Sequence, residues 1–154
     1  MRINIQKSIY DVMANALCVL IIIGSGIYLA LTWGGRAAKV ADNGWEGAAA
    51  FWGGNWGALS FIAFAMVLLA VLSIAEHFPN TWSTGVTITE KNRLRVYRAM
   101  LILFSTVKLV CTIVIAPMVV IFELMPPMIS IVVICVLPII AIIVPLMNLY
   151  RAAR

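Results

Sequence analysis

Charged residues are scarce in this 154-residue chain. Only 11% of the residues are Asp, Glu, Lys or Arg, whereas 64% are hydrophobic, and the mean hydropathy is +1.06. A soluble domain of this size could not hide so much apolar surface from water. The composition therefore excludes an ordinary water-soluble fold and predicts a single membrane domain over residues 1–154, with the lipid bilayer as its solvent.

The residues that carry out enzyme chemistry are also few. The chain has one His and six acidic residues, and it contains no Ser/His/Asp set, no phosphate-binding glycine loop and no zinc motif. The single histidine, His77, has no second His and no Cys near it at metal-ligand spacing. The sequence thus favours a non-enzymatic protein with no catalytic residue, no metal and no cofactor.

The net charge of +5 could suggest a nucleic-acid partner. The basic residues, however, flank the apolar segments instead of forming a separate basic face. Lys and Arg at the ends of membrane helices explain this distribution better than phosphate binding does. No nucleic acid is expected among the partners.

Four long apolar runs take up most of the chain. They predict transmembrane helices over about residues 12–33, 56–75, 97–123 and 127–150, each long enough for the roughly 20 residues that a bilayer requires. The first run is longer than the apolar core of a signal peptide and no cleavage pattern follows it closely, so we interpret it as an uncleaved helix. Pro117 is expected to kink the third helix, and Pro138 and Pro145 to break or bend the fourth.

The distribution of basic residues predicts the orientation. Arg and Lys gather in the N-terminal segment, in the loop 76–96 and at the C-terminus. The connection between the first two helices is near neutral, and the connection between the last two has no basic residue. By the positive-inside rule, the sequence predicts an all-α membrane protein with four transmembrane helices and both termini in the cytoplasm.

The outward connection, residues 34–55, is rich in glycine, alanine and tryptophan. Four tryptophans suit a position at the level of the lipid head groups: Trp33 at the end of the first helix, and Trp45, Trp52 and Trp56 after it. These four side chains are candidate contacts for a ligand or a partner subunit. The alternative is an aromatic surface loop with no special chemistry.

The longest polar interval is the cytoplasmic loop 76–96. Thr87 and Glu90 fit a capping box, and Thr89 is a competing N-cap, so a helix is expected to start near Glu90 and to carry a basic extension into the third apolar run. The loop is a candidate surface for a cytoplasmic or membrane protein partner. Its candidate contact residues are Asn80, Trp82, Thr89, Glu90, Asn92, Arg95, Tyr97 and Arg98.

Lys108 is the most informative ionisable residue of the chain. It follows Arg98 by ten residues, or roughly 15 Å along a helix, which predicts a position near the middle of the bilayer. A lysine there costs at least about 2.5 kcal/mol unless it finds a partner. The candidate partners are carbonyl groups freed by the prolines of the fourth helix, Ser105, Thr106 or a group on another subunit. A functional and a purely structural role both stay open.

The polar loop and the helix after it resemble a known family. The matching stretches are FPNTW at 78–82, VTITEKN at 86–92, RVYR at 95–98 and KL at 108–109. They are similar to small bacterial membrane proteins related to the SdpI immunity proteins. One departure is clear: relatives usually carry a Leu-Pro-x-x-Ile-Pro-x-His-(Phe/Tyr)-Asn motif after the tryptophan that ends the first helix, and residues 34–40 read GGRAAKV here.

The resemblance implies a protein of the bacterial cytoplasmic membrane that protects its cell against a secreted peptide. In some members it also implies signalling, by holding a cytoplasmic repressor at the membrane. The alternative is an accessory subunit of a larger membrane complex such as a transporter, and an independent small transporter is a third hypothesis. The candidate partners are therefore a peptide outside the cell, a membrane or cytoplasmic protein, and a further copy of this chain.

Overall fold

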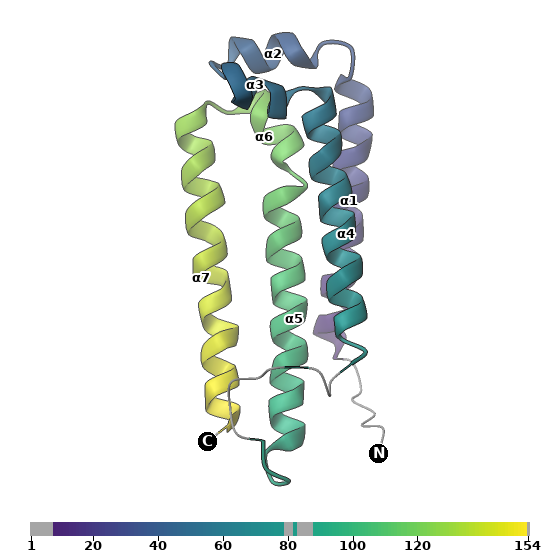
Figure 1. The fold of residues 1–154 in the computed structure, drawn as a ribbon, viewed down its shortest axis with the longest axis vertical. Coiled ribbons are helices and arrows are strands. Elements are labelled where there is room, and N and C mark those ends of the chain that lie inside the picture. The colour runs from purple at the N-terminus through teal and green to yellow at the C-terminus, as the bar shows by residue number, and fades with distance from the viewer. Residues whose placement is uncertain (1–7, 79–81, 83–87, 154) are drawn as a thin grey trace.

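The computed structural model describes residues 8–78, 82 and 88–153. In these residues the chain forms seven α-helices and no strand (Figure 1). The long helices are α1 (Ile9–Thr32), α4 (Asn55–Ala75), α5 (Arg93–Ile115) and α7 (Pro127–Ala153). The short helices are α2 (Arg36–Asp42), α3 (Gly47–Gly53) and α6 (Met118–Leu124).

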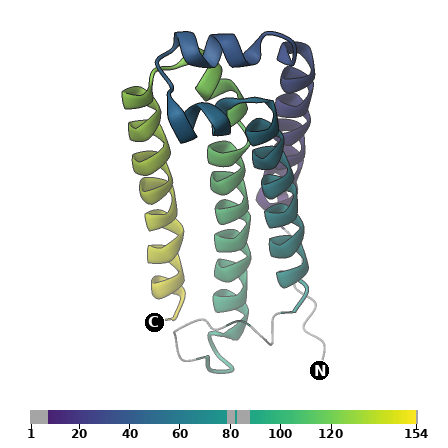
Figure 2. The same cartoon turned by 45° about the horizontal axis from the view of Figure 1, so that its top comes forward.

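The long helices lie side by side in one bundle with α5 at its centre, where it packs against α1, α4 and α7 (Figures 1 and 2). One end of the bundle, which we call the terminal end, holds the start of α1, the start of α5 and the end of α7. Helices α2 and α3 lie across the opposite end, and we call them the cap. The expected order of long helices is therefore present, with a small helical layer closing one end.

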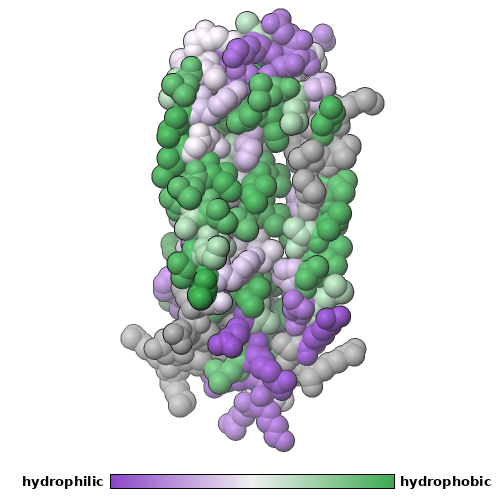
Figure 3. All heavy atoms as spheres, turned by 180° about the vertical axis from the view of Figure 1, so that it is seen from behind, coloured by the Kyte–Doolittle hydropathy of each residue, from purple (hydrophilic) through white to green (hydrophobic). Residues whose placement is uncertain are grey.

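Three helical segments in the described part of the chain are long and apolar enough to cross a membrane. They are Ile9–Thr32, Asn55–Ala75 and Arg93–Leu124, the last of which combines α5 and α6. They correspond to the first three helices expected from the sequence. Apolar side chains cover the middle of the face seen in Figure 3, between polar side chains at the two ends, as a bilayer requires.

The cap was not expected, because residues 34–55 were interpreted as a loop. Helices α2 and α3 have seven residues each, and helices so short are not stable alone in water. Val40 and Trp45 from this segment pack against Phe122 of α6 in a small buried cluster. Contacts with the bundle therefore stabilise the cap helices, and local sequence preference does not reveal such contacts.

The prolines act differently in the two helices that contain them. Pro117 separates α5 from α6, which starts one residue later, where the sequence predicted a kink inside one helix. Helix α7, in contrast, continues through Pro138 and Pro145, so of the two outcomes expected there, a break or a bend, the break does not occur. Membrane helices tolerate proline where neighbouring groups or small local adjustments satisfy the freed carbonyl groups.

Helix α5 starts at Arg93, three residues later than Glu90, where the sequence placed its start. The backbone N–H of Thr89 donates to the Asn92 side-chain oxygen over 2.8 Å, and the Asn92 N–H donates to Thr89 Oγ1 over 3.4 Å. These reciprocal bonds have the pattern of a capping box, but they close the turn that precedes α5, whose own N-cap is Asn92. Thr87 lies outside the described residues.

A close helix contact gives the first testable prediction. Gly57 lies in the first turn of α4, where an added Cβ would come within 2.2 Å of the Trp52 carbonyl oxygen of α3. We expect Gly57→Ala to push α3 away from α4 and to cost about 1–3 kcal/mol through overpacking, measured as a lower unfolding midpoint in detergent. Gly24→Ala is the matched control, because its added Cβ meets nothing within 4 Å. Equal midpoints for the two variants would contradict this packing.

Candidate functional site

Lys108 of α5 is paired inside the bundle, near the terminal end. Its ammonium group donates to Asn15 Oδ1 of α1 over 2.6 Å and lies 2.6 Å from Glu76 Oε1, at the end of α4. The side chains of Lys108 and Glu76 are 0% and 1% exposed. One buried ion pair and one hydrogen bond thus connect three long helices.

A second set of polar contacts joins α1 to α5 beside this ion pair. The Asp11 carboxylate accepts from Ser105 Oγ over 2.7 Å and from the Ser8 backbone N–H over 2.8 Å. The hydroxyl groups of Tyr10 and Thr106 lie 2.8 Å apart, within hydrogen-bond distance. Asp11 is buried in the first turn of α1, where the helix dipole favours a negative charge. We call Asp11, Asn15, Glu76, Ser105, Thr106 and Lys108 the terminal network.

The terminal network changes the interpretation of Lys108. Neither Asn15 nor Glu76 was among its expected partners, and the sequence placed Glu76 at the start of the cytoplasmic loop 76–96. Since Glu76 follows the last residue of α4, the ammonium group lies toward the terminal end and not in the middle of the bundle. The available signal was the acidic residue directly after an apolar run, but its direction depends on how the helices pack.

Arg36 is the corresponding buried cation at the cap end, and no sequence pattern indicated it. It lies on α2 with no exposed surface. Its Nε donates to the carbonyl oxygen of Gly53 over 2.7 Å, its Nη1 donates to Glu123 Oε2 over 3.1 Å, and its Nη2 donates to the Val119 carbonyl oxygen. The planar guanidinium group therefore fastens α2 to the end of α3 and to α6.

Glu123 and its neighbours on α6 complete what we call the cap network. Lys39 Nζ donates to Glu123 Oε1 over 2.7 Å, and Asn43 Nδ2 donates to the Glu123 carbonyl oxygen over 2.5 Å. Trp45 Nε1 donates to the carbonyl oxygen of Met125 over 3.1 Å. These bonds fasten the second half of α2, and the turn after it, to the far end of α6.

The two cations of the cap network have opposite pKa shifts. The hydrogen bond and charge of Glu123 raise the pKa of Lys39, whereas burial lowers the pKa of Arg36. Because the Lys39 pKa is raised, the contribution of the Lys39–Glu123 contact is complete at neutral pH and is lost only as the pH rises through that pKa. The Lys39 side chain is 57% exposed, so water screens this contact far more than that of Arg36.

The four tryptophans expected to face a ligand separate into two groups. Trp33, Trp52 and Trp56 are 42%, 47% and 71% exposed, and the rings of Trp33 and Trp56 meet edge to face at 6.1 Å. Trp45 is only 9% exposed, with its ring 4.4 Å from that of Phe122. This burial corrects the expectation that Trp45 contacts a ligand, because its ring belongs to the core of the cap.

Phe51 joins the exposed group although the sequence did not indicate it. It lies on α3, is 62% exposed and meets the Trp52 ring edge to face at 5.7 Å. We call Trp33, Phe51, Trp52 and Trp56 the aromatic rim. The rim lies at the end of α1, on α3 and at the start of α4, where the cap meets the bundle.

The candidate residues of the cytoplasmic loop 76–96 and the start of α5 also separate, into residues with structural contacts and residues that are exposed. Trp82 Nε1 donates to the Ala75 carbonyl oxygen over 2.8 Å, and its ring lies 5.8 Å from Tyr97 and 5.1 Å from Phe104. Asn92 and Tyr97 are buried, and Asn92 also bonds to Thr89. Thr89, Glu90, Arg95 and Arg98 are exposed and stay available to a partner. Asn80 lies outside the described residues.

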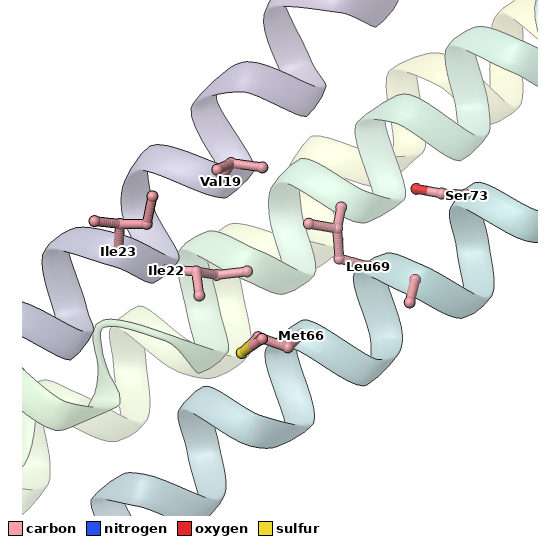
Figure 4. Close-up of a pocket in the computed structure, with 7 residues that line it drawn as sticks. Val19, Ile22, Ile23, Met66, Leu69 and Ser73 are labelled. Carbon is pink, nitrogen blue, oxygen red and sulfur yellow. The ribbon is translucent and has the colours of Figure 1, made fainter.

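Two apolar grooves follow α4. One, of about 280 Å³, lies between α1 and α4 (Figure 4) and is lined by Val19, Ile22, Ile23, Met66, Leu69, Ala70 and Ser73. The other, of about 320 Å³, lies between α4 and α5 and ends near Cys111. Neither lining contains an ionisable pair for acid–base chemistry, and no cluster of three metal-ligating side chains occurs in the described part of the chain.

Comparison with protein-family models, with curated proteins and with solved structures found no match. The contacts, exposure and charge of this chain's own residues therefore carry the functional proposal.

The terminal network gives a second testable prediction. Lys108→Leu leaves the buried Glu76 carboxylate without this ammonium partner, so we expect a loss of about 3–5 kcal/mol in the free energy of unfolding in detergent. Glu76→Leu added to Lys108→Leu should restore part of that loss. Lys91→Leu, at an exposed lysine, is the control and should change stability by less than about 0.5 kcal/mol. A Lys108→Leu variant as stable as this control would refute the buried pair.

The cap network gives a third prediction, from one conservative exchange made at two positions. Arg36→Lys should cost about 1–3 kcal/mol, because a single ammonium group cannot satisfy the acceptors of α3 and α6 together. Lys39→Arg, the reverse exchange at an exposed side chain, should leave the unfolding midpoint nearly unchanged. Thermal unfolding followed by tryptophan fluorescence compares the two, and similar midpoints would mean that Arg36 does not fasten the cap.

Proposed function

We propose that the chain is a multi-pass protein of the bacterial cytoplasmic membrane, with four transmembrane helices, both termini in the cytoplasm and the cap outside. Helix α7, of 27 residues, lies beside α5 and is the proposed fourth span. Arg95, Arg98 and Arg151 are exposed near the terminal end. The cations of the cap, in contrast, are paired with Glu123. This asymmetry supports the orientation by the positive-inside rule.

We further propose that the protein is a receptor-like immunity protein that recognises a secreted peptide at the cap and catalyses no reaction. The observation that supports this most strongly is the aromatic rim, four large exposed rings where the cap meets the bundle. Tryptophan is enriched among the residues that dominate binding energy in protein interfaces. The resemblance of residues 78–109 to the SdpI-like proteins favours the same function.

The cap network makes the rim a suitable recognition surface. Arg36 fastens α2 to the end of α3, which carries Phe51 and Trp52, and to α6. Asn55 Nδ2 donates to the Trp33 carbonyl oxygen over 2.9 Å and so holds the end of α1 against the start of α4. A surface that is already ordered loses less conformational entropy when a ligand binds.

On the cytoplasmic side, the exposed residues of the polar loop and the start of α5 are the proposed contact for a signalling partner. They are Thr89, Glu90, Arg95 and Arg98. The Trp82 ring contacts the rings of Tyr97 and Phe104 on α5, and the terminal network fixes α5 to α1 and α4. A movement of α5 would therefore change the position of the loop.

A role as an accessory subunit is the second candidate, and the surface of α4 favours it. Only 11% of the apolar window of α4 is buried inside the chain, and an apolar groove lies on each side of it. Such a face accepts helices of another subunit, or of a second copy, as readily as lipid. Lys108 is not part of this argument, because Glu76 and Asn15 already pair with it inside the chain.

The immunity function is tested by a pair of substitutions in the rim. Cells that express Trp52→Ala/Trp56→Ala should survive the secreted peptides of the strain of origin at least tenfold less well than cells with the natural protein, because two hot-spot side chains are lost. Tyr150→Ala, which removes an exposed ring near the terminal end, should protect fully. Membrane abundance of each variant is measured in parallel, and full protection by the rim variant at equal abundance would overturn the proposal.

Purification in mild detergent followed by mass spectrometry distinguishes the two candidates. The accessory subunit would be favoured if a protein of another sequence co-purifies in a fixed ratio. That protein should be lost when Val67 and Val71, on the exposed face of α4, are both replaced by Trp. Recovery of the chain alone or as a homo-oligomer would favour the immunity protein.

A further inference from the structure

We propose that the aromatic rim, together with the acidic side chains of Asp42 and Glu46, forms a binding surface for a cationic amphipathic peptide that lies at the membrane surface. The inference rests on the proposed immunity function and gives the chemical class of the peptide. Asp42 is the last residue of α2, and Glu46 is the N-cap of α3. Both side chains are exposed.

The charges of the cap leave a modest negative excess: two cations, Arg36 and Lys39, stand against the three carboxylates of Asp42, Glu46 and Glu123. Both cations bond to the buried Glu123 carboxylate; Arg36 has no exposed surface, whereas the Lys39 side chain is 57% exposed. Asp42 and Glu46, in contrast, form no hydrogen bond or ion pair through their side chains within the described residues. The cap therefore offers a ligand two free carboxylates against one partly exposed lysine, a balance that attracts a cationic partner.

The rim offers chemistry of a complementary kind. Aromatic faces attract the ammonium and guanidinium groups of Lys and Arg through cation–π contacts, and aromatic edges and faces also bind aliphatic side chains. Trp33 and Trp56 lie at the ends of two helices that are apolar enough to cross a membrane. The ends of such helices lie at the lipid interface, which is also the depth at which amphipathic helices bind. One surface thus offers both an apolar and an acidic region to a peptide with an apolar and a basic face.

The spacing of the two regions suits a short helix. Glu46 precedes α3, and Trp52 lies in the last turn of that helix. Six residues of helix separate them by about 9 Å. A peptide helix of two or three turns can therefore place basic side chains near Glu46 while its apolar face contacts the rim.

The charges also argue against other occupants. The anionic head groups of lipids would be repelled by Asp42 and Glu46. A second copy that met this surface through its own cap would bring two further carboxylates against them. The exposed arginines that could neutralise these carboxylates are near the terminal end, across the bundle.

The test uses the full-length protein in nanodiscs of zwitterionic lipid. The probe is a synthetic amphipathic Lys/Leu peptide of about 18 residues, compared with a Glu/Leu peptide of the same pattern and with nanodiscs that hold no protein. We expect the Lys/Leu peptide to bind protein-containing discs at least tenfold more tightly than empty discs, and the Glu/Leu peptide to show no such preference. Equal binding to both kinds of disc, or equal preference for both peptides, would overturn the proposal.

Asp42→Asn/Glu46→Gln is the decisive variant, because it removes both charges from exposed positions and keeps the side-chain shapes. Its affinity for the Lys/Leu peptide should fall about threefold to tenfold, with a larger effect at low salt. Lys91→Gln, which removes an exposed charge near the terminal end, is the control and should bind like the natural protein. An unchanged affinity of the double variant would show that the carboxylates are not part of the surface.

The survival assay separates this inference from the function on which it rests. If Trp52→Ala/Trp56→Ala abolishes protection while Asp42→Asn/Glu46→Gln protects fully, the immunity function stands and the cationic class of peptide is wrong. If the natural protein gives no protection, the immunity function itself is wrong, and the inference fails with it. Loss of protection in both variants at equal abundance supports both.

Discussion

Each positive charge that this bundle buries needs a partner, because hydrocarbon offers neither water nor a counter-ion. Lys108 and Arg36 are the two buried cations of the described structure, one toward each end, and Glu76 and Glu123 are their partners. Removing one partner from such a pair costs about 3–5 kcal/mol. Because the partners are far apart in sequence, the pairs define which helix ends can lie together.

The break between α5 and α6 gives the cap its anchoring point. Pro117 lacks a backbone N–H and ends α5, so α6 is a separate seven-residue helix. That helix carries both the Glu123 carboxylate and the Val119 carbonyl group that receive the Arg36 guanidinium. The cap is thus held by a helix that continues directly from the central one. A disturbance at the cap therefore reaches α5 directly, and the polar loop at its start only along the 23 residues of that helix.

The sequence predicted the long helices well, because a bilayer imposes one strong requirement on them: about 20 apolar residues in a row. It also indicated that Lys108 needed a partner. It did not reveal Arg36, Glu76 or the burial of Trp45, for one common reason. Each of these residues lies at the end of an apolar run or in a connection, where its direction depends on tertiary contacts and not on local pattern. The short helices of the cap depend on the same contacts.

The account depends most on the claim that Lys108 is paired inside its own chain. Solid-state NMR of the protein in lipid bilayers measures this directly. The lysine side chains are labelled with ¹⁵N and the glutamate carboxyl groups with ¹³C, and the Glu76→Gln variant identifies the carboxyl signal of Glu76. The 2.6 Å approach of Lys108 Nζ to Glu76 Oε1 predicts a strong dipolar coupling between the ammonium nitrogen and the carboxyl carbon. A Lys108 signal without that coupling would contradict the account and would place the partner of this lysine on another molecule.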